Sequence, residues 1–209
     1  MDSPDTQIAE FTLQERMRYL FGDHAILRYG WHNFHQIAPG VFRSNQPTHG
    51  RLAAYRAMGI ENVITLRGTG DAIHHRMERA SCAALGLTMH SIGANARKPV
   101  RQQELIRLLD LFRTMPRPFL MHCKSGADRA GLASALYLLD QEGAPIHEAR
   151  RMLSFRYLHI QRSATGILDH ILDRFEARQA DGAIGIRDWI ETEYSTDDIA
   201  RSWAAGRRG

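Results

Sequence analysis

The sequence predicts an α/β domain with a central, mostly parallel sheet of four to five strands flanked by helices. Two observations lead to this fold class. From Pro39 onward, short apolar segments that include β-branched residues alternate with longer segments of helical periodicity, as in strand–helix–strand units. Glycine or proline stands at many of the junctions between them, and these residues commonly end helices and strands.

The individual elements follow from this pattern. Strands are expected at Gly40–Arg43, Asn62–Leu66, Leu87–Ile92 and Phe119–His122, and helices at Thr48–Met58, His74–Leu85 and 101–115. In the last of these helices, leucines and Phe112 recur at the spacing of a single helical face, which indicates a buried side. Asn45-Gln46-Pro47 is expected to end the first strand, and residues 130–180 are expected to be helical.

The predicted domain covers residues 37–180. Residues 1–36 form an N-terminal extension that is partly helical, because Ile8, Phe11, Leu13, Met17, Leu20 and Phe21 give a loose apolar stripe ending near Gly22. Three roles are open for this extension: packing on the domain, which is favoured, contact with a membrane surface, or dimerisation. Residues 181–209 are expected to form a helical tail packed on the domain.

Composition limits the function classes. The 209-residue chain has a net charge of +4, and most of its basic residues are arginine. This excess suits an anionic substrate and is too small to predict nucleic-acid binding. No apolar run is long enough for a membrane span, and the N-terminus lacks the pattern of a secretory signal. Two cysteines, Cys82 and Cys123, fit a reducing, cytoplasmic compartment.

The clearest candidate site is the loop that follows the predicted strand 119–122. Backbone N–H groups between a strand's end and a helix N-terminus converge on one centre, and the helix dipole adds positive potential. Such a loop binds a phosphate dianion and favours a thiolate over a thiol. Gly126 permits tight curvature, and Arg129 can grip two phosphate oxygens with its planar fork. The loop reads His122, Cys123, Lys124, Ser125, Gly126, Ala127, Asp128 and Arg129.

At these residues the chain resembles the protein tyrosine and dual-specificity phosphatase superfamily, whose signature is His-Cys-x5-Arg. The resemblance extends over about residues 38–178 and includes Val41–Pro47, Gly59–Arg67 and Ser154–His159, which look like segments of bacterial dual-specificity-like enzymes. The resemblance implies a dual-specificity phosphatase-like fold and hydrolysis of phosphomonoesters through a phosphocysteine intermediate. It implies no metal or other cofactor.

The resemblance also assigns roles within the loop. Cys123 is the expected nucleophile, and Arg129 is expected to hold the phosphoryl oxygens together with the backbone amides of residues 124–129. Lys124, Ser125, Gly126 and Ala127 are thus substrate-binding residues. His122 is a supporting residue that orients the loop through hydrogen bonds.

Two departures from the family pattern concern catalysis. The family usually carries a general-acid Asp on a separate upstream loop, but the corresponding segment Ser91–Pro99 contains no carboxylate. Asp128 is the best substitute, because Asp occupies this position in some relatives and because a nearby thiolate and phosphate would raise its pKa. A structural Asp128 is the alternative. The second departure is Ala130, where the family has Ser or Thr that assists the thiolate's departure, so slow phosphoenzyme hydrolysis is expected.

Substrate and partner remain open at this level. A phosphorylated protein carrying phosphotyrosine, phosphoserine or phosphothreonine is favoured, and a phosphoinositide or another lipid or saccharide phosphate is the alternative. Phosphoinositide phosphatases often carry basic residues at the first and fourth positions after the cysteine. Lys124 matches the first of these positions, whereas Ala127 occupies the fourth. An inactive phosphate-binding pseudophosphatase and a rhodanese-type sulfurtransferase are less favoured. Cys82 is expected in the core rather than as a resolving thiol, and Arg97 and Lys98 could border the pocket or lie at the surface.

Overall fold

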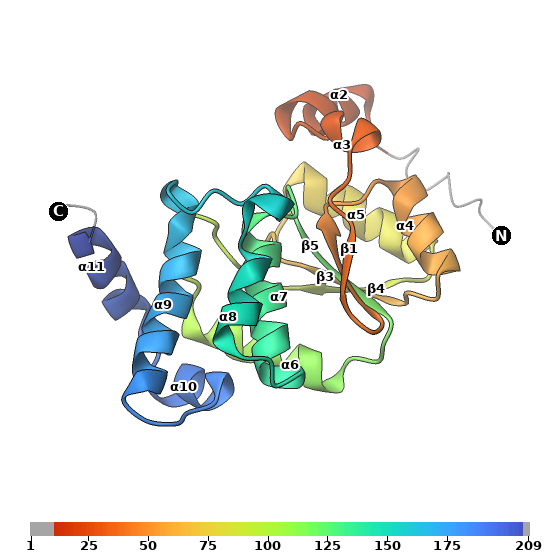
Figure 1. Cartoon of the computed structure of the whole chain (residues 1–209). Helices are drawn as coiled ribbons and strands as arrows, with labels where there is room; N and C mark the ends of the chain where they lie inside the picture. Colours follow the sequence, from red (N-terminus) through yellow and green to blue (C-terminus); the bar gives the residue numbers. More distant parts are fainter. Residues whose placement is uncertain (1–10, 207–209) are drawn as a thin grey trace. The chain divides into compact units, whose positions relative to one another are not determined.

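The computed structural model describes residues 11–206 (Figure 1). They form two compact units. The first contains the described residues up to Ser91 together with Pro116–Ser125, and the second contains Ile92–Met115 together with the described residues from Gly126 onward. The chain therefore passes from the first unit to the second within the predicted phosphate-binding loop. The predicted domain limits at residues 37 and 180 stay predictions.

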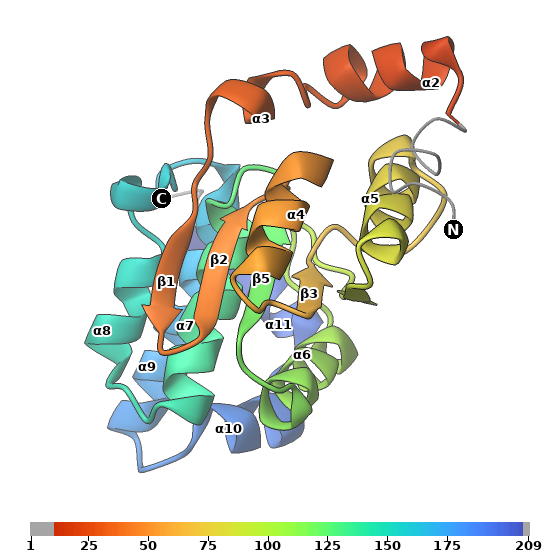
Figure 2. The same cartoon turned by 90° about the vertical axis from the view of Figure 1, so that its right-hand side faces the viewer.

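The first unit is built on one five-stranded sheet. Its strands are β1 (His35–Ala38), β2 (Val41–Asn45), β3 (Asn62–Thr65), β4 (Thr88–Ser91) and β5 (Phe119–Cys123). Their order is β1-β2-β5-β3-β4, and every neighbouring pair is parallel except β1 and β2. Figure 2 shows β1, β2, β5 and β3 side by side. The predicted fold class, α/β with a mostly parallel sheet, is confirmed.

The edge strand β1 is the element that the sequence pattern missed. It pairs with β2 alone, and none of its four residues is buried. A strand of this kind needs no apolar run, so neither alternation nor β-branching marks it in the sequence. Strand β2 also continues through Asn45, where a break was predicted, because Asn45 pairs with Cys123 of β5.

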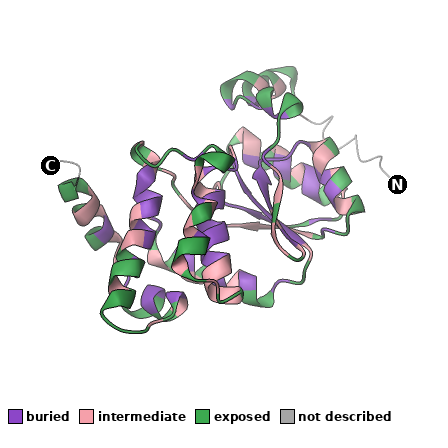
Figure 3. Cartoon of the chain, viewed as in Figure 1, coloured by how far each residue is buried: buried purple, intermediate pink, exposed green. Residues whose placement is uncertain are grey.

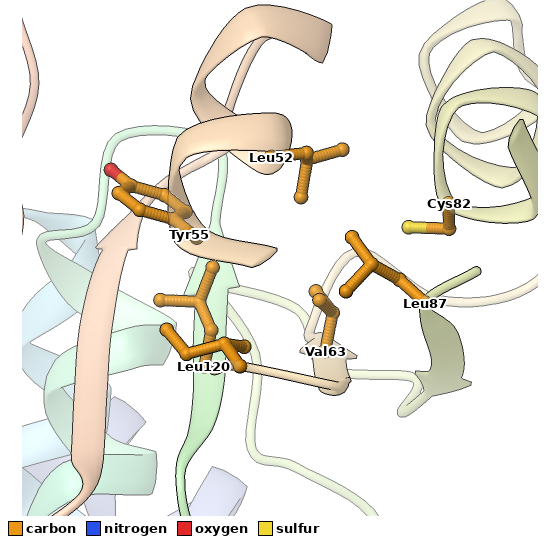
Figure 4. Close-up of a cluster of buried hydrophobic side chains, with 7 residues drawn as sticks. Leu52, Tyr55, Val63, Cys82, Leu87 and Leu120 are labelled. Carbon is orange, nitrogen blue, oxygen red and sulfur yellow. The ribbon is translucent and has the colours of Figure 1, made fainter. Parts of the chain in front are cut away.

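Helices α4 (His49–Ala57) and α5 (Ile73–Ala84) supply part of the core of this unit. A cluster of buried side chains joins them to the sheet; it comprises Leu52, Tyr55, Ile60, Val63, Cys82, Leu87 and Leu120 (Figure 4). Full burial of one such aliphatic side chain contributes about 1.5–3 kcal/mol. This cluster therefore fixes the two helices against β3 and β5, the strands that lead to the candidate site.

The N-terminal part of the unit is helical, and the face that it buries is not the apolar stripe. It comprises α2 (Leu13–Met17), a π-helix η1 (Arg18–Gly22) and α3 (Leu27–Gly30). Leu13 and Phe21 of the apolar stripe are 77% and 54% exposed, whereas Tyr19 is buried and carries the Arg28 guanidinium over its ring. Figure 3 shows α2 and α3 mainly in the exposed colour. Ile8 lies outside the described residues.

The second unit is helical. It comprises α6 (Gln102–Thr114), α7 (Asp128–Gln141), α8 (Ile146–Ala149), the 3-10 turns η2 (Arg150–Met152), η3 (Phe155–Tyr157) and η4 (Ala164–Gly166), α9 (Ile167–Ala180), α10 (Ile186–Thr192) and α11 (Thr196–Gly206). Helix α7 is buried at every position from 130 to 137, which marks a central helix.

The C-terminal segment is tied to α6 and α7 by polar contacts. The Tyr194 hydroxyl donates to the Val100 carbonyl at 2.6 Å, and Arg187 pairs with Asp110 of α6 and Asp140 of α7 at 2.9 and 3.2 Å. Within residues 11–206, no helix combines the length and the apolar character that a membrane crossing requires.

Candidate active site

Cys123 ends the central strand of the sheet. Strand β5 lies between β2 and β3, and all five of its residues are buried. Asn45 of β2 pairs with Cys123, and Thr65 of β3 pairs with His122. The carboxyl ends of three parallel strands thus meet beside Cys123, which is where open α/β sheets place their ligand sites.

Only residues 124–127 separate β5 from the start of α7 at Asp128. Gly126 has a φ of +74°, a left-handed conformation that L-residues other than glycine adopt at a cost. The chain can therefore turn from strand into helix within four residues, as the sequence predicts. A 14-residue helix begins there, and its free N–H groups and dipole suit an anion.

Side chains of the first unit hold the start of this loop. The Asn33 amide Nδ2 donates to the Ser125 carbonyl at 3.2 Å, and the Asn33 backbone N–H donates to Asn45 Oδ1 at 3.3 Å. The Gln46 N–H donates to the Lys124 carbonyl at 3.4 Å. Asn33 belongs to the predicted extension, so residues before 37 contribute directly to the loop.

His122 forms the centre of a buried polar chain beneath the loop. Its Nε2 contacts the Glu78 carboxylate from α5, and its Nδ1 lies 3.4 Å from the Cys123 carbonyl. The second Glu78 oxygen accepts from Gln46 Nε2 at 2.9 Å. His122 and Gln46 are fully buried. Groups buried in this way rigidify their surroundings when they are paired, which fits the supporting role predicted for His122.

Asp23 is the focus of a second cluster, which includes the residue after the nucleophile. Its carboxylate accepts from Arg67 at 2.6 Å and from Arg28 at 2.7 Å, and Lys124 Nζ lies 3.7 Å away. Arg67 also contacts the Gln46 side chain. Burial by itself would raise the pKa of Asp23, but the hydrogen bonds and charges of Arg67 and Arg28 hold that pKa far below its ordinary value.

Substituting Asp23→Asn is expected to lower the free energy of unfolding by about 3–5 kcal/mol, because it leaves two buried guanidinium groups without a countercharge. The contribution of a carboxylate with a lowered pKa is present above the unfolded-state pKa of about 3.9 and is lost as pH falls. Urea unfolding at neutral and acidic pH checks both effects, and the difference between wild type and variant should shrink below about pH 4. Asp71→Asn, at a 92% exposed side chain, is the control; an equal loss there would contradict the prediction.

Asp128 belongs to a three-membered chain in the second unit. Its Oδ1 lies 2.8 Å from His159 Nδ1, and the His159 Nε2 lies 2.6 Å from Asp169 Oδ2 of α9. The His159 side chain is fully buried, and Asp128 is 21% exposed. Burial lowers the pKa of His159, but the hydrogen bonds to the two carboxylates outweigh it and raise the pKa to about 9. His159 is therefore an imidazolium at neutral pH.

Arg129 reaches the segment in which the family places its general acid. Its Nη1 donates to the Ala94 carbonyl at 3.4 Å. The carboxylate that the structure adds to this segment is Glu104 of α6, which accepts from the Gly93 N–H at 2.8 Å and pairs with Arg107 at 3.1 Å. Glu104 is buried and occupied in this way, so it holds the loop and is a poor candidate for the acid.

The remaining predicted residues have clear positions. Ala130 is fully buried in α7, and its carbonyl accepts from the Ser134 hydroxyl at 2.6 Å. Cys82 lies in the core cluster beside Val63 and Leu87 (Figure 4), and burial raises the pKa of its thiol. Arg97 and Lys98 are exposed. In the described part of the chain, no three His, Cys, Asp or Glu side chains are grouped to hold a metal.

Comparison with known proteins places these features in a family. The model of the tyrosine phosphatase family matches residues 29–144, more than half of the chain. The chain belongs to this family. The predicted relationship to the tyrosine and dual-specificity phosphatase superfamily is thereby confirmed, and family membership supports a phosphatase. No curated protein matches the sequence significantly.

Solved structures of phosphatases share the fold. P. aeruginosa TpbA aligns with a TM-score of 0.55 and 22% identity over 71% of this chain and 91% of its own. A second structure of TpbA, a cysteine-to-serine form in complex with pTyr, gives a TM-score of 0.55 and 21% identity over 72% and 91% of the two chains. The core catalytic domain of the PP-IP phosphatase SIW14 from S. cerevisiae, in complex with citrate, gives 0.53 and 13% over 71% and 93%.

Sequence reasoning missed the partners of the loop residues. Glu78, His159 and Asp169 carry no local signature, and each lies in a segment whose pattern indicates only a helix or a turn. The one available signal was the resemblance of Ser154–His159 to a family segment, which marked His159 without indicating its contact with Asp128.

Proposed function

We propose that this protein is a cysteine-dependent phosphomonoesterase that works through a phosphocysteine at Cys123. The observation that carries the proposal is the position of the Cys123–Arg129 motif. It begins at the buried end of the central parallel strand β5 and ends in the first turn of α7, in a chain of the tyrosine phosphatase family.

The chemistry follows from the residue types. The Cys123 thiolate attacks phosphorus, an S–P bond forms, and the ester O–P bond breaks. Arg129 and the loop amides bind the phosphoryl oxygens as charge shifts. Water then attacks phosphorus, the S–P bond breaks, and thiolate and inorganic phosphate are released. A thiolate nucleophile requires reducing conditions, which supports a cytoplasmic location as part of the proposal.

Asp128 is proposed as the acid that protonates the leaving oxygen. It is partly exposed at the N-terminus of α7, and Glu104, the carboxylate at the Ser91–Pro99 segment, is occupied by the Gly93 N–H and two arginines. Asp128→Asn is expected to lower turnover of alkyl phosphates about 10²–10³-fold while changing turnover of activated nitrophenyl phosphates little. Steady-state kinetics on both substrates test this, and an equal loss on both would exclude Asp128 as the acid.

Ala130 is expected to slow the second step. Adding a hydroxyl with Ala130→Ser should speed hydrolysis of the phosphocysteine by about tenfold, because the departing thiolate gains a hydrogen-bond donor. Serine adds one atom at this fully buried position and is the smaller change than threonine. Rapid-quench single turnovers measure the step. An unchanged rate would show that another group already stabilises the thiolate.

For the substrate we propose a phosphorylated protein, and TpbA in complex with pTyr supports this class. The alternative is a phosphoinositide or another lipid or saccharide phosphate. One observation supports a lipid phosphate as the alternative substrate. Four apolar side chains are at least 54% exposed and suit peripheral contact with a membrane, namely Leu13, Phe21, Leu27 and Tyr29. A panel of phosphotyrosine peptide, phosphothreonine peptide and phosphoinositide in vesicles decides between them by kcat/KM.

A phosphate-binding pseudophosphatase is the alternative of another class, and Ala130 is the feature that favours it. It predicts binding of inorganic phosphate without turnover of nitrophenyl phosphate. Turnover that depends on Cys123 would reject it.

A further inference from the structure

The contacts of His159 determine where its protons lie. Both ring nitrogens face a carboxylate oxygen, Nδ1 facing Asp128 at 2.8 Å and Nε2 facing Asp169 at 2.6 Å. A neutral imidazole has one N–H and one lone pair, so it could donate to only one of the two carboxylates. The geometry therefore requires that Asp128, His159 and Asp169 together hold one proton more than a neutral imidazole between two carboxylates would hold.

That proton has two positions along the 2.8 Å contact. With the proton on Nδ1, His159 is an imidazolium between two carboxylates. With the proton on Oδ1, Asp128 is a neutral carboxylic acid and His159 is a neutral imidazole that still donates to Asp169. The second arrangement is the form that a general acid needs, and a lone, partly exposed Asp would hold it poorly at neutral pH.

A turn with a left-handed residue holds His159 in this position. Leu158, the preceding residue, has a φ of +63°, a left-handed conformation that costs a non-glycine residue about 1–2 kcal/mol. The turn is held by the Leu158 N–H to the Phe155 carbonyl and the His159 N–H to the Ser154 carbonyl, at 2.9 and 3.1 Å. It leaves Leu158 half exposed and buries the His159 ring. Strain of this kind collects at functional positions.

Close packing between helices brings the segment onto α7. A Cβ added to Gly131 would lie 2.6 Å from Leu153 Cδ2 and 2.8 Å from the Met152 carbonyl. Only glycine at this position lets η2 approach α7 so closely, and the chain then continues to His159. The contact with Asp128 is thus built into the packing of the second unit.

We propose that His159 is a positioning residue that stores the proton Asp128 delivers to the leaving group, with Asp169 as the fixed countercharge. This inference rests on the proposed function. When the O–P bond breaks, the leaving oxygen keeps the electron pair and takes the shared proton, which passes from His159 Nδ1 through Asp128 Oδ1 and leaves Asp128 a carboxylate and His159 a neutral imidazole. When water attacks the phosphocysteine, Asp128 accepts a proton from it and returns it to His159. Protons balance over the cycle.

The experiment compares pH profiles of full-length variants. The charged groups that the structure places against His159 are Asp128 from α7 and Asp169 from α9. In wild type, kcat/KM for an alkyl phosphate should hold up to about pH 9, where His159 loses its proton. His159→Asn, which can donate to Asp128 but stores no proton, should lower this value about 10–100-fold at pH 8 and move the alkaline limb to lower pH.

One control substrate and two further variants complete the experiment. An activated nitrophenyl phosphate, which needs no acid, should be turned over by His159→Asn at nearly the wild-type rate. Asp169→Asn keeps an acceptor for Nε2 but removes the charge, and should shift the limb in the same direction by less. His170→Asn is the matched control, because that histidine contacts Ser202 of α11 at 2.7 Å and Asp173 of its own helix at 3.9 Å; its profile should match wild type.

The outcomes separate the inference from the proposed function. An unmoved alkaline limb in His159→Asn, or equal losses on alkyl and nitrophenyl substrates, would overturn the proton store and leave His159 structural. Absence of turnover that depends on Cys123 in wild type would overturn the proposed function and the inference with it. Independently of turnover, ¹⁵N NMR of the full chain should show His159 as an imidazolium at pH 7; a neutral ring would overturn the inference.

Discussion

Cys123→Ser is expected to lower turnover of nitrophenyl phosphate by at least about 10⁴-fold. A serine hydroxyl is a far weaker nucleophile than a thiolate, and in the proposed function the thiolate stands in a loop that leads into a helix N-terminus. Rapid quench of the wild-type enzyme should trap phosphate on Cys123, and mass spectrometry of the quenched protein should locate it. The serine variant should bind phosphate normally, because the loop amides and Arg129 are unchanged.

The second cysteine provides the matched control. Cys82 is 1% exposed in the core beside α4 and β3, so Cys82→Ala should keep full turnover and lower the free energy of unfolding by about 1–2 kcal/mol. Loss of activity in Cys82→Ala with retention in Cys123→Ser would reverse the assignment of the nucleophile. Retention in both would remove cysteine chemistry from the proposal.

Arg129→Lys is expected to lower kcat by about 10³-fold while preserving the charge. A lysine ammonium is a point charge, whereas the guanidinium presents a planar fork to two phosphoryl oxygens. Arg129 also donates to the Ala94 carbonyl at 3.4 Å, which fixes its direction within the second unit. Steady-state kinetics on nitrophenyl phosphate, together with vanadate inhibition as a probe of phosphate-like binding, separate lost turnover from lost affinity.

Arg113→Lys controls for a general effect of arginine replacement, since Arg113 of α6 is 66% exposed and pairs only loosely with Asp110 at 3.8 Å. Its kcat should equal that of wild type. An Arg129→Lys enzyme with a kcat near wild type would show that charge alone suffices, and the bidentate role would then be wrong.

The sequence predicted the parallel core of the fold well because each of its strands is locally recognisable. Strands β3 and β5 are mostly buried on both faces, so they appear as short apolar runs that need no partner to be identified. Strand β1 could not be found in this way, because its residues are not buried and its only reason to be extended is pairing with β2.

The N-terminal extension shows the same limit of prediction from local sequence patterns. Its apolar stripe lies largely exposed, whereas Tyr19, Asp23 and Arg28 are buried, and Asp23 forms the ion pair with Arg67. A charged residue buried against a charge from far along the chain has no periodic signature. Asp23 and Arg67 are such a pair.

By itself, the sequence was enough to predict the chemistry of the loop. A cysteine, a glycine and an arginine within seven residues between a strand and a helix form the pattern of a phosphate site, and this pattern is local in the sequence. Only the tertiary structure decided what supports that loop. The supporting residues come from distant segments of the chain: Glu78 contacts His122, Asn33 donates to Ser125, and His159 contacts Asp128 and Asp169. Burial strengthens these contacts. Asp128, left with two interpretations by the sequence, thereby gains a specific partner that can hold its proton.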